Sequence, residues 1–225
     1  MELVKNLQAN GISVLMYADS GKGKTTALSM LPGKTLIIDV DRGTSVLGGM
    51  NANVDVVRLK DDLSNFKEII DEVKKDCKWD NICIDTVSEL EKAMLTQYGR
   101  TGKNDGAPEI GHYSKVDFKL SDYMRELRNL VDNGVNIVVT AWEKVMDVTL
   151  PSGEKYSRLM PLVRKPAEVC GMFDIVAHMV IKEEEDGTQT RGFVLDSNTL
   201  AFAKDRVWKR KGCKVEDLIP TAGNK

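Results

Sequence analysis

The chain has 225 residues, of which 42% are hydrophobic and 29% are charged, and its formal net charge at pH 7 is -2. These proportions are ordinary for a globular domain and exclude a disordered or fibrous protein. Because the net charge is small, nucleic-acid binding would have to come from local basic patches or from repetition in an oligomer.

The cysteines and the termini bear on the compartment. The four cysteines form no C-x-x-C pair, and only two histidines accompany them, which excludes a zinc site of the usual spacing. No stretch approaches the roughly 18 apolar residues of a membrane span, and residues 1–10 lack the apolar run of a signal peptide. We therefore expect a soluble protein of a reducing cytoplasm.

Short apolar runs bounded by Gly, Asn or Asp predict four buried strands, at residues 12–16, 35–40, 82–85 and 136–142. Continuous apolar character is typical of strands that are covered on both faces. Apolar residues at helical spacing predict helices over 66–77 and 116–131. This alternation predicts an α/β fold in which helices flank a mostly parallel, doubly wound sheet.

After residue 142 the pattern changes to shorter strands joined by turn sequences. Residues 145–150 and 156–160 enclose Pro151-Ser152-Gly153-Glu154, which predicts a protruding hairpin. Residues 174–181 and 190–195 enclose an acidic turn and predict a second hairpin at the sheet edge.

A single domain over residues 1–225 accounts for the whole pattern. Residues 1–10 are expected to be a lead-in, and residues 220–225 a frayed tail. Mobile loops are expected over 99–115, which is polar and rich in Gly, and over 145–160.

The most specific motif follows the first apolar run and precedes a helix-like segment that starts at Thr26. It reads Ala18-Asp19-Ser20-Gly21-Lys22-Gly23-Lys24-Thr25. Glycines at a strand-to-helix turn let backbone N–H groups and the helix N-terminus face phosphate, so residues 18–26 predict an ATP site. Lys24 would neutralise the β- and γ-phosphates, and the Thr25 hydroxyl would bind Mg²⁺. Ala18 replaces the usual first Gly, and its small side chain predicts only a modest change in the loop path.

Carboxylates end two of the predicted strands. Asp85 ends the third, so it would reach the sheet edge beside the loop and hold Mg²⁺ directly or through water. Alternatively, Asp85 caps the helix that follows. Asp39 and Asp41 end the second strand, and period-two alternation places them on the same side, where one can face the γ-phosphate. The alternative for Asp41 is a solvated turn with Arg42.

With the loop, Asp41, the Asp85-Thr86 pair and Ala203-Lys204-Asp205-Arg206, most of the chain resembles the small phage RecA-like ATPases of single-strand annealing and recombination. This resemblance implies a RecA-like P-loop NTPase core with C-terminal β-hairpins at one edge, and a DNA-stimulated ATPase that uses ATP and Mg²⁺. Asp41 matches by position the carboxylate that activates water in this family. Because Glu is usual there, the shorter Asp implies slow turnover.

The resemblance also implies partners and further site residues. Lys204 and Arg206 resemble the fingers that act on a neighbour's ATP in RecA-like rings and filaments, and Thr140 or Glu143 stands where relatives place a γ-phosphate sensor. Glu109-Ile110-Gly111 resembles the end of the first DNA-binding loop of RecA. Expected partners are single-stranded DNA, further copies of the chain and a single-strand-binding protein, and the resemblance to phage proteins implies the host cytoplasm as the compartment.

Cations interleaved with tyrosines suit contacts to single strands. Such residues occur in two segments, which are expected to project from one end of the sheet; an ordinary solvated loop is the alternative for each. The first segment offers Arg100, Lys103, His112, Tyr113 and Lys115, and the hairpin offers Lys155, Tyr156 and Arg158. A third basic cluster comprises Lys204, Arg206, Lys209, Arg210, Lys211 and Lys214.

Two other functions share the phosphate-binding loop. A small-molecule or nucleotide kinase needs an Arg-rich lid, for which residues 99–115 are the sole candidate. A non-catalytic ATP switch of the partition type would carry its signature lysine at Asp19, which weighs against that class.

Overall fold

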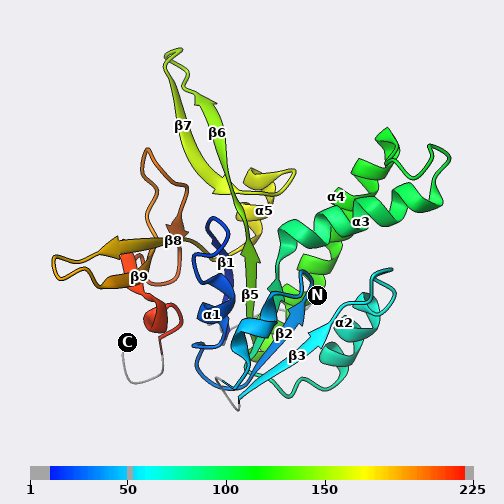
Figure 1. Ribbon diagram of the computed structural model, residues 1–225, viewed down its shortest axis with the longest axis horizontal. Helices are drawn as coiled ribbons and strands as arrows, with labels where there is room; N and C mark the ends of the chain where they lie inside the picture. The colour runs from blue at the N-terminus through cyan, green and yellow to red at the C-terminus, as the bar shows by residue number, and fades with distance from the viewer. Residues whose placement is uncertain (1–10, 50–52, 221–225) are drawn as a thin grey trace, which may run out of the picture.

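The computed structural model describes residues 11–49 and 53–220 (Figure 1). The lead-in expected at residues 1–10 and most of the expected tail, residues 221–225, lie outside the described residues. Within the described residues, no helix is long and apolar enough to cross a membrane.

A nine-stranded sheet carries the fold, in the order β11-β9-β8-β1-β5-β4-β2-β3, with β10 paired to β8. Its parallel part runs from β3 to β8. The parallel strands are β1 (Ser13–Tyr17), β2 (Thr35–Asp39), β3 (Val54–Arg58), β4 (Asn81–Asp85), β5 (Asn136–Ala141) and β8 (Ile175–Glu183). Antiparallel strands extend the β8 edge: β9 (Gln189–Val194), β10 (Lys204–Asp205) and β11 (Gly212–Lys214). This confirms the predicted α/β class, the four apolar strands and the second hairpin.

Helices cover both faces of the sheet. They are α1 (Lys24–Leu28), α2 (Phe66–Lys75), α3 (Val87–Thr101), α4 (Ile110–Arg128) and α5 (Pro166–Met172), with 3-10 turns η1 (Gly43–Leu47), η2 (Asn129–Asn133) and η3 (Val215–Asp217). In β1, Leu15 and Tyr17 belong to the core with α2 to α5, whereas Val14 and Met16 belong to the core with α1. Since successive strand residues point to opposite faces, two covered faces explain the continuous apolar runs.

The segment expected to be a mobile loop at 99–115 is mostly helical. Residues 99–101 end α3 and residues 110–115 begin α4, so the connection spans only 102–109. A capping box starts α4: the backbone N–H of Glu109 donates to His112 Nδ1 at 3.1 Å, and the Glu109 side chain accepts from the backbone of His112. This reciprocal cap starts the helix within a sequence whose glycines suggested a loop.

The first predicted hairpin is confirmed as β6 (Glu143–Thr149) and β7 (Lys155–Pro161), which form a separate two-stranded sheet. Its strands are paired along their whole length, so residues 145–160 are a ribbon rather than a loop. The hairpin projects from the carboxyl-end edge of the central strands, and the tip of α3 and α4 projects beyond that edge as well (Figure 1). The two segments predicted to contact single strands therefore lie at the same end of the sheet.

Candidate functional site

The phosphate-binding loop connects β1 to α1 and wraps around one lysine. Gly21 and Gly23 adopt φ angles of 76° and 101°, in the left-handed region that favours glycine. Lys24 is 7% exposed, and its Nζ donates to the carbonyls of Ala18 and Asp19, each at 2.9 Å. Burial lowers the pKa of Lys24, and the Asp85 carboxylate gives the largest opposing influence. The lysine is thus held at the centre of the predicted ATP site.

Asp85, at the end of β4, joins two hydroxyl groups in a buried cluster. Thr25 Oγ1 donates to Asp85 Oδ2 at 2.6 Å, and Thr140 Oγ1 donates to Asp85 Oδ1. Burial raises the pKa of Asp85, and the hydrogen bonds from Thr140 and Thr25 oppose that shift. Thr86 caps α3 by accepting from the backbone N–H of Glu89 at 3.1 Å, so the alternative role of Asp85 as a helix cap does not apply.

The two carboxylates at the end of β2 have different surroundings. Asp39 is buried, accepts a hydrogen bond from Thr44 Oγ1 and lies 3.6 Å from Arg58 Nε. Asp41 is exposed, and its Oδ1 accepts from Gly43 N at 2.9 Å. A Cβ on Gly43 would lie 2.8 Å from Asp41 Oδ1 and 3.6 Å from Thr25 Oγ1, which places the Asp41 carboxylate close to Thr25. Of the pair, Asp41 is therefore the carboxylate open toward the phosphate site.

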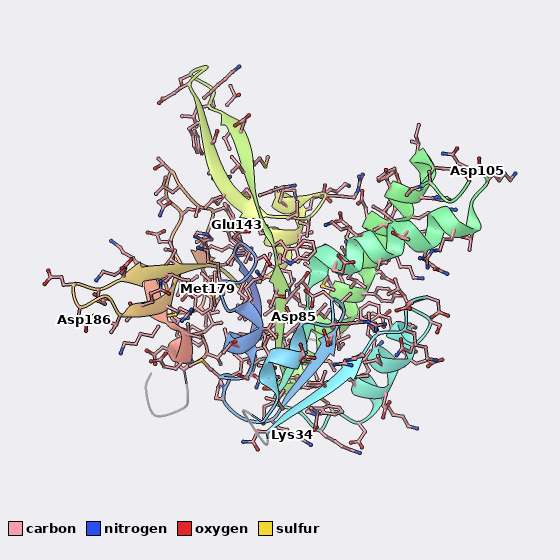
Figure 2. All side chains as sticks on the ribbon, viewed as in Figure 1. Lys34, Asp85, Asp105, Glu143, Met179 and Asp186 are labelled. Carbon is pink, nitrogen blue, oxygen red and sulfur yellow. The ribbon has the colours of Figure 1, made fainter. Side chains whose placement is uncertain are left out.

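A histidine and a glutamate complete the site where β5 passes into β6. His178 Nε2 lies 3.0 Å from Glu143 Oε2, and the ring of Tyr17 lies 4.9 Å from the ring of His178. Glu143 is one of the carboxylates that raise the pKa of Lys24. In Figure 2, Asp85 lies at the centre of the molecule and Glu143 at the foot of the β6–β7 hairpin.

Thr140 and Glu143 were both predicted as the γ-phosphate sensor. Thr140 is fully buried, and its hydroxyl donates a hydrogen bond to Asp85. Thr140 is therefore placed to orient that carboxylate, which leaves Glu143 as the sensor candidate. Nothing in the local sequence marks His178, because its position follows from the parallel pairing of His178 with Tyr17 across β8 and β1.

The predicted finger residues lie in and directly after β10, which pairs with β8 on the other side of β1 from β2 and Asp41. Arg206 Nη2 donates to the carbonyl of Gly171 in α5 at 3.0 Å. Burial lowers the pKa of Lys204, and the positive charge of Arg206 lowers it further. Among the described residues, neither side chain hydrogen-bonds to the phosphate-binding loop of its own chain.

Three residues proposed to contact DNA have structural partners instead. His112 is buried, bonded to Glu109 and stacked on Tyr98 with ring centroids 5.6 Å apart, so it is not open to a nucleic acid. Arg158 is partly buried and lies 5.1 Å from the ring centre of Phe202. Arg210 forms a 2.7 Å ion pair with the buried carboxylate of Asp205.

The remaining candidates for DNA contact are open to different extents. Arg100, Lys103, Lys115 and Lys155 are exposed, whereas Tyr113 and Tyr156 are partly buried. The guanidinium of Arg164 covers the Tyr113 ring at 4.5 Å. Lys103 belongs to the α3–α4 connection and Lys155 to the start of β7, so both projecting elements keep an exposed lysine.

The strand order and the site together define a P-loop NTPase: a glycine-rich loop follows β1 and holds a buried lysine, and β5 lies between β1 and β4, which carries the carboxylate of Asp85. A family model described as an AAA domain matches residues 10–207, and the chain belongs to this family of P-loop ATPases.

Two further comparisons concern known proteins. The fold is similar to that of the flagellar accessory protein FlaH from Methanocaldococcus jannaschii, with a TM-score of 0.47 and 8% sequence identity over 90% of this chain and 83% of that chain. No curated protein matches the sequence.

Proposed function

We propose that the protein is a Mg²⁺-dependent ATPase that works as an oligomer on single-stranded DNA in recombination, annealing or replication of the phage type. The observation that carries the ATPase part is the buried contact of Thr25 and Asp85, with Lys24 held in the loop beside it. Family membership supports nucleotide binding and hydrolysis. The exposed lysines on the two projecting elements support the DNA part.

The donor set fits Mg²⁺. Thr25 and Asp85 offer a hydroxyl and a carboxylate, the hard oxygen ligands that Mg²⁺ takes alongside water and nucleotide phosphates. Across residues 11–49 and 53–220, no group of three or more His, Cys, Asp or Glu side chains is arranged to hold a metal by itself. The two residues would hold the ion, which when bound neutralises charge on the β- and γ-phosphates.

The other site residues, Lys24, Asp41 and Glu143, have separate roles in hydrolysis. Lys24 donates to phosphate oxygens, and the Ala18 and Asp19 carbonyls fix its ammonium group before the nucleotide arrives. Asp41 orients and deprotonates the attacking water, because its carboxylate lies beside Thr25 and is free of a cation partner of its own among the described residues. Glu143, held by His178, senses the γ-phosphate from the hairpin side.

Oligomerisation follows from the finger residues. Lys204 lies in β10, which pairs with β8, and Arg206 follows it; neither side chain hydrogen-bonds to the loop of its own chain among the described residues. They would therefore act on ATP only if this side of the sheet meets a neighbouring subunit. Such a finger stabilises charge on the transferring phosphoryl group and is worth ~10³ to 10⁵ in rate in related chemistry.

Steady-state ATP hydrolysis with and without single-stranded DNA tests the proposal. We expect stimulation by DNA, a requirement for Mg²⁺, and loss of turnover in Lys24→Ala with the fold intact. Lys75→Ala, an exposed lysine at the end of α2, is a matched control and should hydrolyse normally. Near-normal turnover in Lys24→Ala would refute the ATPase assignment.

The DNA path has its own test. Lys103→Ala combined with Lys155→Ala should weaken single-strand binding and reduce its salt dependence, because each lost phosphate contact lowers the slope by about 0.7. Arg158→Ala, at a partly buried position, should add little. An unchanged salt slope in the double variant would contradict this DNA path and would favour binding at Lys209, Lys211 and Lys214.

A kinase is the second candidate, because a groove of about 630 Å³ opens beside Asp41 and offers room for a phosphoryl acceptor. Arg42, Lys60 and Arg100 line this groove. Phosphate transfer from ATP to a nucleoside, with turnover unaffected by DNA, would favour the kinase over the proposed function.

A further inference from the structure

One arginine reaches the phosphate-binding loop from a part of the chain that no motif singled out. Arg191 lies in β9 opposite Ile181 of β8, and its Nε donates to the carbonyl of Lys22 at 3.3 Å. Phe193, two residues further along β9, is buried in the core that contains α1. Since alternate residues of a strand share a face, Arg191 is on the side of the sheet that carries α1 and the loop.

The arginine packs against bare backbone of the loop. A Cβ on Gly23 would lie 3.4 Å from Arg191 Nε and 3.6 Å from Arg191 Cδ, and Gly23 has a φ of 101°. The side chain is therefore in contact with the loop at its last glycine, directly before Lys24. Any side chain at position 23 would compete with Arg191 for this space.

The outer end of the guanidinium is free to bind a ligand. Arg191 is exposed, and its hydrogen bond to Lys22 uses Nε alone, so that among the described residues Nη1 and Nη2 have no partner. A planar fork of N–H donors matches the oxygens of a phosphate group, which it binds with two parallel hydrogen bonds.

The two flanks of the loop indicate which phosphate is within reach. Thr25, Asp85 and Asp41 lie on one flank and define the end of the site that takes Mg²⁺ and the γ-phosphate. Arg191 lies on the other flank, because β9 and β8 stand on the side of β1 away from β5, β4 and β2, and it contacts Lys22 and Gly23. A triphosphate that runs along the loop therefore brings its α-phosphate and nucleoside toward Arg191.

We infer that Arg191 binds the α-phosphate of the nucleotide, so that the β8–β9 hairpin forms one wall of the ATP site. This inference rests on the proposed ATPase function and assigns a residue to the nucleoside end of that site. It predicts that nucleoside di- and triphosphates gain affinity from Arg191, whereas pyrophosphate, which fills the β- and γ-positions beside Lys24, does not.

The test measures dissociation constants of ATP, ADP and pyrophosphate for Arg191→Gln. Loss of a charge-assisted hydrogen bond should raise the dissociation constants of ATP and ADP roughly 10-fold or more and leave that of pyrophosphate unchanged. Arg191→Lys keeps the charge without the planar fork and should fall between Arg191→Gln and the unmodified protein. Lys182→Gln removes an equal charge from the opposite face of the same hairpin and should bind all three ligands normally.

Two results would overturn the inference. Unchanged ATP and ADP affinity in Arg191→Gln would exclude contact with the α-phosphate. An equal loss of affinity for all three ligands would mean that Arg191 only supports the loop backbone through Lys22. Failure of the underlying ATPase function gives a different result, since the unmodified protein and Lys24→Ala would then bind ATP equally poorly.

Discussion

Replacing Thr140 by valine removes one hydroxyl from the buried Asp85 cluster while keeping the size and branching of the side chain. Thr140 and Asp85 are both fully buried, so water does not substitute for the lost donor at Asp85 Oδ1. Thr25 remains as the other hydroxyl partner of Asp85, at 2.6 Å. The substitution therefore isolates one hydrogen bond to a carboxylate in a dry environment.

The size of the effect follows from this geometry. A hydrogen bond to a charged group contributes about 1.5–3 kcal/mol, and the pKa of Asp85, already raised by burial, should rise further. If the carboxylate must be ionised and correctly oriented to hold Mg²⁺, the loss converts to roughly 10-fold or more in affinity for nucleotide with Mg²⁺. A destabilisation of about 2 kcal/mol should also lower the Tm by about 4–8 °C in a chain of this size.

The assay is ATP binding titrated against Mg²⁺ concentration, with thermal unfolding measured in parallel. Thr140→Val should require more Mg²⁺ for the same ATP affinity, whereas Thr140→Ser, which keeps the hydroxyl, should behave much like the unmodified protein. An unchanged Mg²⁺ requirement in Thr140→Val would refute the assignment of Thr140 as the residue that orients Asp85. A lower Tm with an unchanged Mg²⁺ requirement would leave Thr140 a purely structural role.

Three further predictions concern other groups. Asp41→Asn should keep ATP binding and lose roughly 10²-fold or more in turnover, whereas Glu143→Gln should lose less; the reverse order in single-turnover hydrolysis would make Glu143 the base. Arg206→Ala should bind ATP and hydrolyse it poorly, and mixing it with Lys24→Ala should restore some turnover, which full activity of a dilute monomer would contradict. Burial raises the pKa of Glu91 above its ordinary value of 4.5, so the stability that this group contributes is fully present below that value and is lost as the pH rises through the raised pKa. Glu91→Gln should therefore raise the Tm at about pH 8 and change it little at about pH 4, and an equal Tm difference at both pH values would contradict this explanation.

The fold was predictable where apolar patterns are continuous. Four strands are covered on both faces, and their sequences are therefore apolar almost without interruption: β1, β2, β4 and β5. Strand β3 was missed because it is the outer strand of the sheet and its residues are exposed or half-buried, so that no apolar run marks it. Helix α5 was missed as well, because its seven residues are too few to show a helical period.

The residues of the site likewise fall into those that a local pattern indicates and those that only the fold brings together. The loop, Lys24 and Asp85 follow from a local motif and from the end of a strand, so the sequence alone indicates them. His178 and Arg191 enter the site through pairing between strands that are far apart in the chain, and the contact of Thr140 with Asp85, in place of the expected sensor role, has the same origin. No local pattern encodes such neighbours, because the register that aligns one strand with another is set by the packing of the whole sheet.

The outer edge at β3 limits how copies of this chain can join. An edge strand presents unpaired backbone groups to which another chain can add, and charged side chains are one means of preventing this. Asp55 and Arg58 lie on β3, where they are exposed and form ion pairs with Lys34 and Asp39. A second subunit that extended the sheet through β3 would have to cover these charges. An assembly of this chain is therefore not expected to continue the sheet through β3, and that end of the sheet is expected to lie within its own subunit.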